Sequence, residues 1–154
     1  IETKKIEAIK IIEEDLKLFD YKIRIDFVAK VKQILDKVRI NPANVTLEVT
    51  ESLAINDMER MKRVLKQLKA LGVCVALDDF GTGYSSLSML TKLPVDIVKL
   101  DKEFLSHSET DTTKKMLKNV IRLIKDNDMK VLCEGIEERE QMDILREAGC
   151  DIGQ

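Results

Sequence analysis

Tryptophan is absent from the chain, and proline, histidine and cysteine are scarce: the 154 residues include two prolines, one histidine and three cysteines. The histidine, His107, lies in the polar stretch 106–113, which argues against histidine catalysis and favours a solvated loop residue. Cys74, Cys133 and Cys150 show no CxxC spacing, and each lies beside apolar or β-branched residues. This pattern predicts reduced, packed thiols in a cytosolic protein.

Long apolar runs, a signal peptide and an excess of one charge are also missing. The longest apolar runs, such as residues 73–77, are far shorter than the ~20 residues that cross a bilayer. Residues 1–10 are charged throughout, and no small-residue cleavage site follows them. Lys and Arg number 26 against 28 Asp and Glu, without a basic block, which argues against a partner that is polymeric nucleic acid. We therefore expect a cytoplasmic globular protein.

Short β-branched runs alternate with helical patterns along most of the chain. Strands are predicted at 45–49, 73–77, 96–100 and 130–133, and a fifth begins within 150–153. Helical apolar spacing fills the gaps between them, with Asn56 and Glu59 predicted as a capping box, and with Met116 and Met142 placed on apolar stripes. This alternation predicts a parallel α/β sheet. An open doubly wound sheet and a (β/α)8 barrel both fit, and the length alone favours the open sheet.

Polar groups recur at or just past the carboxyl end of every predicted strand. They are Glu48, Asp78, Asp79, Lys99, Glu134 and Gln154. Ligands bind at this edge in parallel βα folds. Carboxylates that converge there need a counter-charge, and carboxylate and amide oxygens suit Mg²⁺ or Mn²⁺. The adjacent pair Asp78–Asp79 could bridge two metal ions.

Each of these residues also has a structural interpretation. Asp79 could simply cap the following helix, Glu48 could point to solvent from an edge strand, and Lys99 could be a surface lysine. The Gly- and hydroxyl-rich segment 81–86 could cradle a phosphate or form a flexible loop, and it lacks a Walker lysine.

Four motifs, in this order along the chain, resemble the sequence signatures of one known family. Residues 78–86 (DDFGTGYSS), 47–52 (LEVTES), 93–101 (LPVDIVKLD) and 134–137 (EGIE) are similar to the signatures of EAL domains, the bacterial cyclic-di-GMP phosphodiesterases. The resemblance runs from about residue 26 to residue 154. It implies a TIM-like (β/α)8 barrel, of which this chain would hold about five βα units, rather than the open sheet.

The resemblance also implies roles for individual residues. A two-metal site with Mg²⁺ or Mn²⁺ would be formed by Glu48, Asp78, Asp79, Glu134 and Gln154. Lys99 would act on the attacking water together with Asp79 and Glu134 as catalytic groups, and Ca²⁺ would inhibit because its bonds are longer. Glu51 would brace the loop that contains Gly81, Thr82 and Gly83, and Glu137 would support the site. Asp101 and Tyr84 would be substrate contacts.

The chain departs from the family pattern in its first residues. The EAL tripeptide and the following strand with a metal-binding Asn are absent, and residues 1–25 resemble a linker helix from an upstream module. We therefore expect residues 26–154 to be a partial EAL domain of a longer protein. That protein would be a homodimer with a sensory or GGDEF-like module, and could be the cytoplasmic part of a membrane-anchored sensor. The predicted function is hydrolysis of cyclic-di-GMP to linear pGpG. The alternative is an inactive module that binds the dinucleotide or a protein partner.

Overall fold

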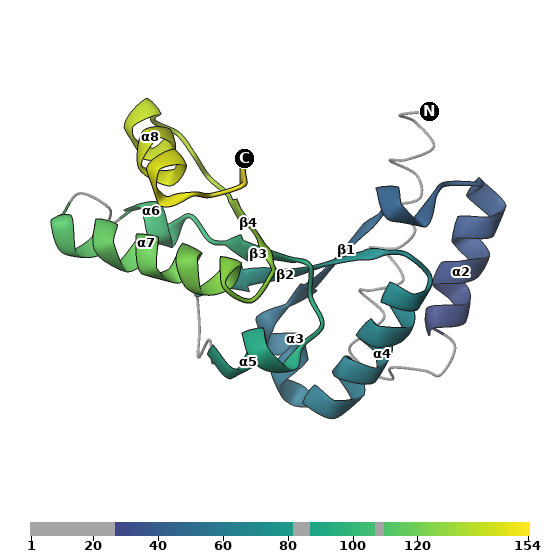
Figure 1. The fold of residues 1–154 in the computed structure, drawn as a ribbon. Helices are drawn as coiled ribbons and strands as arrows, with labels where there is room; N and C mark the ends of the chain where they lie inside the picture. Colours follow the sequence, from purple (N-terminus) through teal and green to yellow (C-terminus); the bar gives the residue numbers. More distant parts are fainter. Residues whose placement is uncertain (1–26, 82–86, 107–109) are drawn as a thin grey trace.

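The computed structural model describes residues 27–81, 87–106 and 110–154, whose strands form one parallel sheet (Figure 1). Each strand pairs with the preceding one, so the order is β1-β2-β3-β4-β5. The strands are β1 (Thr46–Thr50), β2 (Cys74–Phe80), β3 (Ile97–Leu100), β4 (Lys130–Cys133) and β5 (Ile152–Gly153). All five lie within one to three residues of the predicted positions, because β-branched runs favour buried parallel strands.

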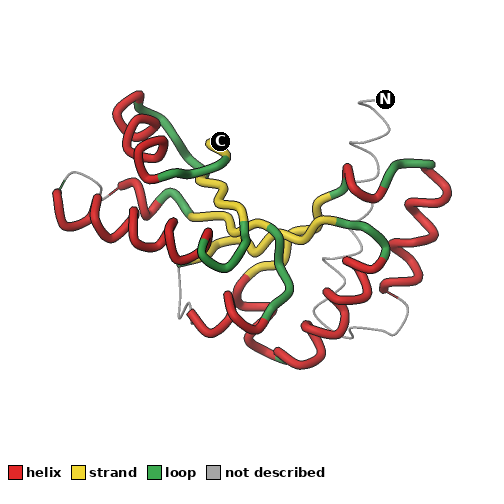
Figure 2. The backbone as a smooth tube through the Cα atoms, viewed as in Figure 1, coloured by secondary structure: helices red, strands yellow, loops and turns green. Residues whose placement is uncertain are grey.

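The helices lie between the strands in the chain. A short 3-10 turn, η2 (Pro42–Asn44), precedes β1. The α-helices are α2 (Phe27–Val38), α3 (Glu51–Asn56), α4 (Met58–Ala70), α5 (Leu87–Lys92), α6 (Glu103–Ser106), α7 (Asp111–Lys125) and α8 (Arg139–Ala148). Helices α2, α4, α5 and α7 gather along one side of the sheet (Figure 2).

The sheet is part of a barrel and not an open doubly wound sheet. A doubly wound sheet reverses its strand order and carries helices on both faces. Here the order follows the sequence, and one face holds the core. Its buried residues include Leu47, Val49, Val75, Leu77, Val98, Leu100, Val131 and Cys133. The prediction of about five βα units of a barrel is confirmed. The open sheet that chain length alone favoured is wrong.

Helix packing follows the predicted stripes with three differences. Met116 and Met142 are 60% and 47% exposed, whereas Leu117 and Leu145 in the same two helices are buried, so the buried stripe of each helix is narrower than predicted. The capping box at Asn56 and Glu59 is wrong. Residues 51–56 already form α3, so the chain turns at Asp57, whose side chain accepts a hydrogen bond from the Arg60 N–H (3.1 Å) and caps α4.

The three cysteines form no disulfide, and two of them, Cys74 and Cys133, are strand residues of the sheet. Cys133 is buried, and Cys74 and Cys150 are half-buried. Burial raises the pKa of the Cys133 thiol to about 12, so this thiol is inert at neutral pH. None of the helices in the described ranges is long and apolar enough to cross a membrane.

Candidate active site

Three carboxylates from three strand ends meet on one buried lysine. Lys99, in β3, is 6% exposed. Its Nζ lies 3.0 Å from Glu48 Oε1, 2.9 Å from Asp78 Oδ1 and 2.8 Å from Glu134 Oε1. Parallel strands bring these residues together, because β1, β2, β3 and β4 are successive neighbours and their carboxyl ends share one edge. The interpretation of Lys99 as a surface residue is wrong, and Glu48, although half-exposed, is tied to this cluster.

The electrostatics of this cluster favour a charged lysine. Burial by itself would lower the pKa of Lys99, but hydrogen bonds to Glu134, Asp78 and Glu48 outweigh it and hold the pKa above its usual value. The ammonium therefore stays protonated throughout the physiological range. With three ionised carboxylates around it, the four groups carry a net charge of −2, which is one divalent cation short of neutrality.

Asp79 reaches the same edge through an irregularity in β2. Leu77 pairs with Val98 and Phe80 with Leu100, so β2 holds one more residue than β3 between these two pairs. Asp79 has φ +56°, and its N–H donates to Asp78 Oδ1 at 3.0 Å. Because of this bulge, two consecutive aspartate side chains can lie at the same site, whereas a regular strand would point them to opposite faces of the sheet.

The surroundings of Asp79 place it among the acidic groups. Burial, and then the charges of Asp78 and Asp101, raise the pKa of Asp79, while Lys99 acts in the opposite direction. Asp79 lies in β2, and the next described helix begins at Leu87, so it does not cap that helix. Sequence reasoning missed the bulge, although two adjacent aspartates predicted at one edge were a signal for it.

Glu51 and Gly81 directly follow the ends of β1 and β2. Glu51 is the first residue of α3 and is 5% exposed, so it does not simply face solvent. Gly81 has φ +104°, and a Cβ there would lie 2.0 Å from a ring carbon of Phe104 in α6. The remaining predicted loop residues, Thr82, Gly83 and Tyr84, fall outside the described residues, as does His107. Bracing of the loop by Glu51 therefore stays a prediction.

Three further predicted residues take other positions. Asp101 Oδ1 accepts from the Glu103 N–H (2.8 Å) and so shapes the start of α6. The Glu137 backbone N–H donates to Gln141 Oε1 (2.9 Å), while Glu137 itself is exposed. Gln154 is held by its backbone, whose N–H donates to the Cys133 carbonyl (2.9 Å) and whose carbonyl accepts from Ile136 (3.1 Å), and the residue is exposed.

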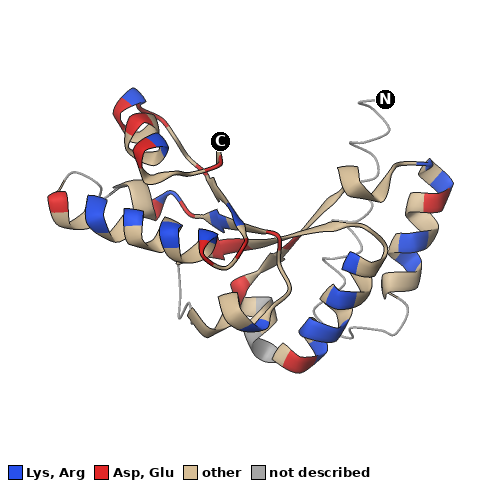
Figure 3. Cartoon of the chain, in the orientation of Figure 1, with Lys and Arg blue, Asp and Glu red and all other residues tan. Residues whose placement is uncertain are grey.

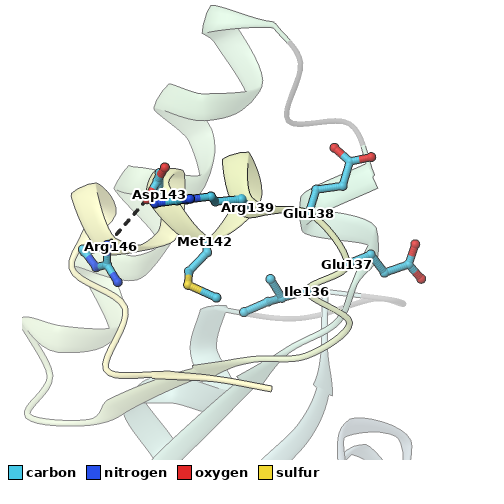
Figure 4. A pocket seen from close by; sticks show the side chains of 7 residues that line it. All are labelled: Ile136, Glu137, Glu138, Arg139, Met142, Asp143 and Arg146. Carbon is cyan, nitrogen blue, oxygen red and sulfur yellow. Dashed lines mark ion pairs between the residues drawn. The ribbon is translucent and has the colours of Figure 1, made fainter.

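A separate hollow of about 440 Å³ lies beside the start of α8 (Figure 4). Ile136 and Met142 form its apolar part, and charged side chains surround them, among which Arg146 pairs with Asp143 at 3.5 Å. Glu137 and Glu138 point away from Met142. This hollow shares no residue with the Lys99 cluster.

The residues at the Lys99 cluster fit a divalent cation in donor chemistry and in charge. Carboxylate oxygens are the ligands that Mg²⁺ and Mn²⁺ prefer, and the cluster is short of positive charge. In the part of the chain that the structure describes, no three His, Cys, Asp or Glu side chains form a ready-made group for an ion. The carboxylates instead meet on Lys99. Within the described ranges, the basic residues lie largely on helices α2, α4 and α7 (Figure 3).

Comparisons of the chain with known proteins agree on one family. The model of the EAL domain family matches residues 9–154. The match begins within the segment 1–25 that we assign to a linker; residues 1–26 lie outside the described ranges, so this boundary stays a prediction.

Two relatives and one solved structure illustrate the similarity. The chain is 36% identical over 127 residues to the bifunctional diguanylate cyclase/cyclic di-GMP phosphodiesterase MucR of Pseudomonas aeruginosa, covering 80% of this chain and 18% of that protein. It is 34% identical over 134 residues to the cyclic di-GMP phosphodiesterase NbdA of the same organism, covering 85% and 17%. The manganese/cy-diGMP complex of Klebsiella pneumoniae BlrP1 aligns with a TM-score of 0.76 at 32% identity, covering 83% of this chain and 33% of that one.

The chain spans only a small part of its relatives, between 15% and 20% of the length of the curated proteins it matches. The family match nevertheless covers most of the chain, and the solved structure shares its fold. Together with the strand-end carboxylates and Lys99, these findings show that the chain belongs to the EAL domain family.

Proposed function

We propose that this chain forms part of a metal-dependent phosphodiesterase that hydrolyses cyclic-di-GMP to linear pGpG. The observation that carries the proposal is the convergence of Glu48, Asp78 and Glu134 on the buried Lys99 at the ligand-binding edge of the sheet. Relatives named as cyclic di-GMP phosphodiesterases, and a solved manganese/cy-diGMP complex, support the substrate and the metal.

The carboxylates of Glu48, Asp78, Asp79 and Glu134 would hold the cation, with Mg²⁺ or Mn²⁺ as the proposed ion. When bound, the ion would polarise the phosphodiester and lower the pKa of the attacking water toward neutrality. Ca²⁺ should inhibit, since it prefers longer bonds and more ligands.

Lys99 would supply the fixed positive charge of the site. In hydrolysis, an oxygen from water bonds to phosphorus and one ester P–O bond breaks, while negative charge builds on the phosphoryl oxygens. A buried, permanently protonated ammonium stabilises that charge without having to reorganise. Asp79, which lies at the same edge, would help to hold the attacking water.

The test is turnover of cyclic-di-GMP by the protein that contains this chain. We expect pGpG with Mg²⁺ or Mn²⁺, and none after chelation or with Ca²⁺. Lys99→Ala and Asp78→Asn should each lower kcat by about 10²-fold or more. Lys118→Ala is the matched control, because Lys118 forms one exposed pair with Glu147 (3.2 Å) on the helical surface. Near-normal turnover of Lys99→Ala would refute its assigned role.

The second candidate is a module that binds cyclic-di-GMP, or a protein partner, without hydrolysing it. It is favoured by the finding that, among the described residues, no three His, Cys, Asp or Glu side chains are already arranged to hold a metal ion. Binding of cyclic-di-GMP in titration calorimetry, with no pGpG formed at saturating Mn²⁺, would establish this binding function. A homodimer and an upstream sensory or GGDEF-like module remain predictions under either function.

A further inference from the structure

We infer that Lys99 is an internal counter-ion that holds Glu48, Asp78 and Glu134 together in the metal-free chain and competes with the divalent cation for them. The inference rests on the proposed metal site, and it concerns the state before the cation binds. It assigns to Lys99 a positioning role that is separate from any contact with substrate or water.

The first ground is how Lys99 is partnered. Its three contacts, of 2.8 to 3.0 Å, use one oxygen from each of three side chains, and these come from β1, from β2 and from the residue after β4. An ammonium has three N–H donors, so all of its donors are used. Lys118, by comparison, meets only Glu147, at 3.2 Å, with both side chains largely exposed. A lysine with all three donors engaged fixes the relative position of three chain segments.

The second ground is burial. The Lys99 side chain is 8% exposed, whereas those of Glu48, Asp78 and Glu134 are 52%, 20% and 37% exposed. The lysine therefore lies beneath the carboxylates, which are open to solvent on their other sides. A cation arriving from solvent meets the carboxylates first, and the ammonium below them has the same sign of charge.

Competition follows from this arrangement. Each carboxylate oxygen that bonds to Nζ is engaged before the cation arrives, and the ammonium repels a second positive charge. Removal of the ammonium leaves three carboxylates facing one another without compensation. The metal-free fold should then lose stability, while affinity for the cation should rise.

The decisive variant is Lys99→Met, which keeps the length of the side chain and removes its charge. Thermal unfolding in chelator should show a Tm lower by about 6 °C or more, as expected for a buried charge cluster that loses its partner. Titration calorimetry with Mn²⁺ alone should show binding about tenfold tighter than in the wild type. Lys118→Met is the control for loss of an exposed lysine.

A second comparison covers the case in which Lys99→Met is too unstable to titrate. Glu134→Gln should lower the metal-free Tm of the wild type, since one bond to Lys99 is weakened. The same substitution should raise the Tm in the Lys99→Met background, since it relieves repulsion. This reversal of sign supports the counter-ion, as does folding of Lys99→Met only when Mn²⁺ is present.

Several outcomes would overturn the inference. The first is a folded Lys99→Met protein whose Mn²⁺ affinity is unchanged or weaker than that of the wild type. The second is a metal-free Tm of Lys99→Met that equals the Tm of Lys118→Met. The third is a Lys99→Met protein that does not fold and that neither Mn²⁺ nor Glu134→Gln restores. None of these readouts uses turnover. A protein that binds Mn²⁺ as described but forms no pGpG would refute the proposed function and leave the counter-ion intact.

Discussion

Replacement of Gly81 by alanine should destabilise the end of β2 more than an ordinary glycine substitution would. Gly81 follows β2 directly and lies two residues after Asp79. Its φ of +104° disfavours any residue with a Cβ, and the added Cβ would lie 2.0 Å and 2.4 Å from two ring carbons of Phe104. The backbone and the ring contact should therefore each contribute to the loss of stability.

The magnitude follows from these two parts. A left-handed backbone costs an L-residue about 1–2 kcal/mol, and overpacking against a ring costs about 1–3 kcal/mol. Gly81→Ala should thus lower the free energy of unfolding by about 3 kcal/mol, or the Tm by about 6–12 °C for a chain of this size. Gly72→Ala isolates the backbone part, because Gly72 has φ +89° but its added Cβ would meet only Pro42 Cβ, at 3.4 Å. It should cost about 1–2 kcal/mol.

The assay is thermal unfolding of the single variants and of Gly81→Ala combined with Phe104→Leu. The smaller side chain should recover part of the stability lost in Gly81→Ala. Mn²⁺ titration should also show weaker binding in Gly81→Ala than in Gly72→Ala, since displacement of residue 81 moves Asp79. Equal Tm values for Gly81→Ala and Gly72→Ala, with no gain from Phe104→Leu, would refute the steric reasoning.

Three further predictions concern support, acid stability and metal identity. Glu51→Ala, which removes a buried carboxylate at the start of α3, should weaken apparent Mg²⁺ affinity and cut turnover, with partial recovery at excess Mg²⁺. Superimposable metal titrations of the two proteins would exclude a role in holding the loop. Burial alone would raise the pKa of Asp151, but bonds from the Val131 N–H (2.9 Å) and Lys125 (3.0 Å) hold it below its usual value. Ionised Asp151 therefore stabilises the fold above the ordinary carboxyl pKa, and this stabilisation is lost as the pH falls through the pKa of the folded state. Asp151→Asn should lower the Tm by about 2–4 °C at pH 7. The difference in Tm between the wild type and the variant should disappear between about pH 5 and pH 2. Ca²⁺ added to the Mn²⁺-loaded protein should inhibit in proportion to site occupancy, and equal turnover with Ca²⁺ would contradict the carboxylate site.

Local sequence patterns predict the order of the elements and the sheet edge that carries the polar residues. Runs such as 73–77 and 131–133 are apolar on consecutive residues, as buried parallel strands require, and right-handed βα connections place their carboxyl ends together. Glu48, Asp78, Lys99 and Glu134 could therefore be assigned to one edge from the order of residues alone. Local propensity and chain connection are sufficient for this level of prediction.

The contacts among these side chains depend on tertiary structure. Burial of Lys99 beneath three carboxylates depends on the register of four strands, and this register forms only when segments that are distant in the sequence pair with one another. The bulge at Asp79 depends on an extra residue in β2 relative to its neighbour β3, and the burial of Glu51 depends on α3 folding back against β1 and β2. The cap at Asp57 and the exposure of Met116 and Met142 were likewise settled by where the helices begin and which faces they bury. Packing between distant segments, and not local sequence, turned a row of strand-end residues into one charged cluster.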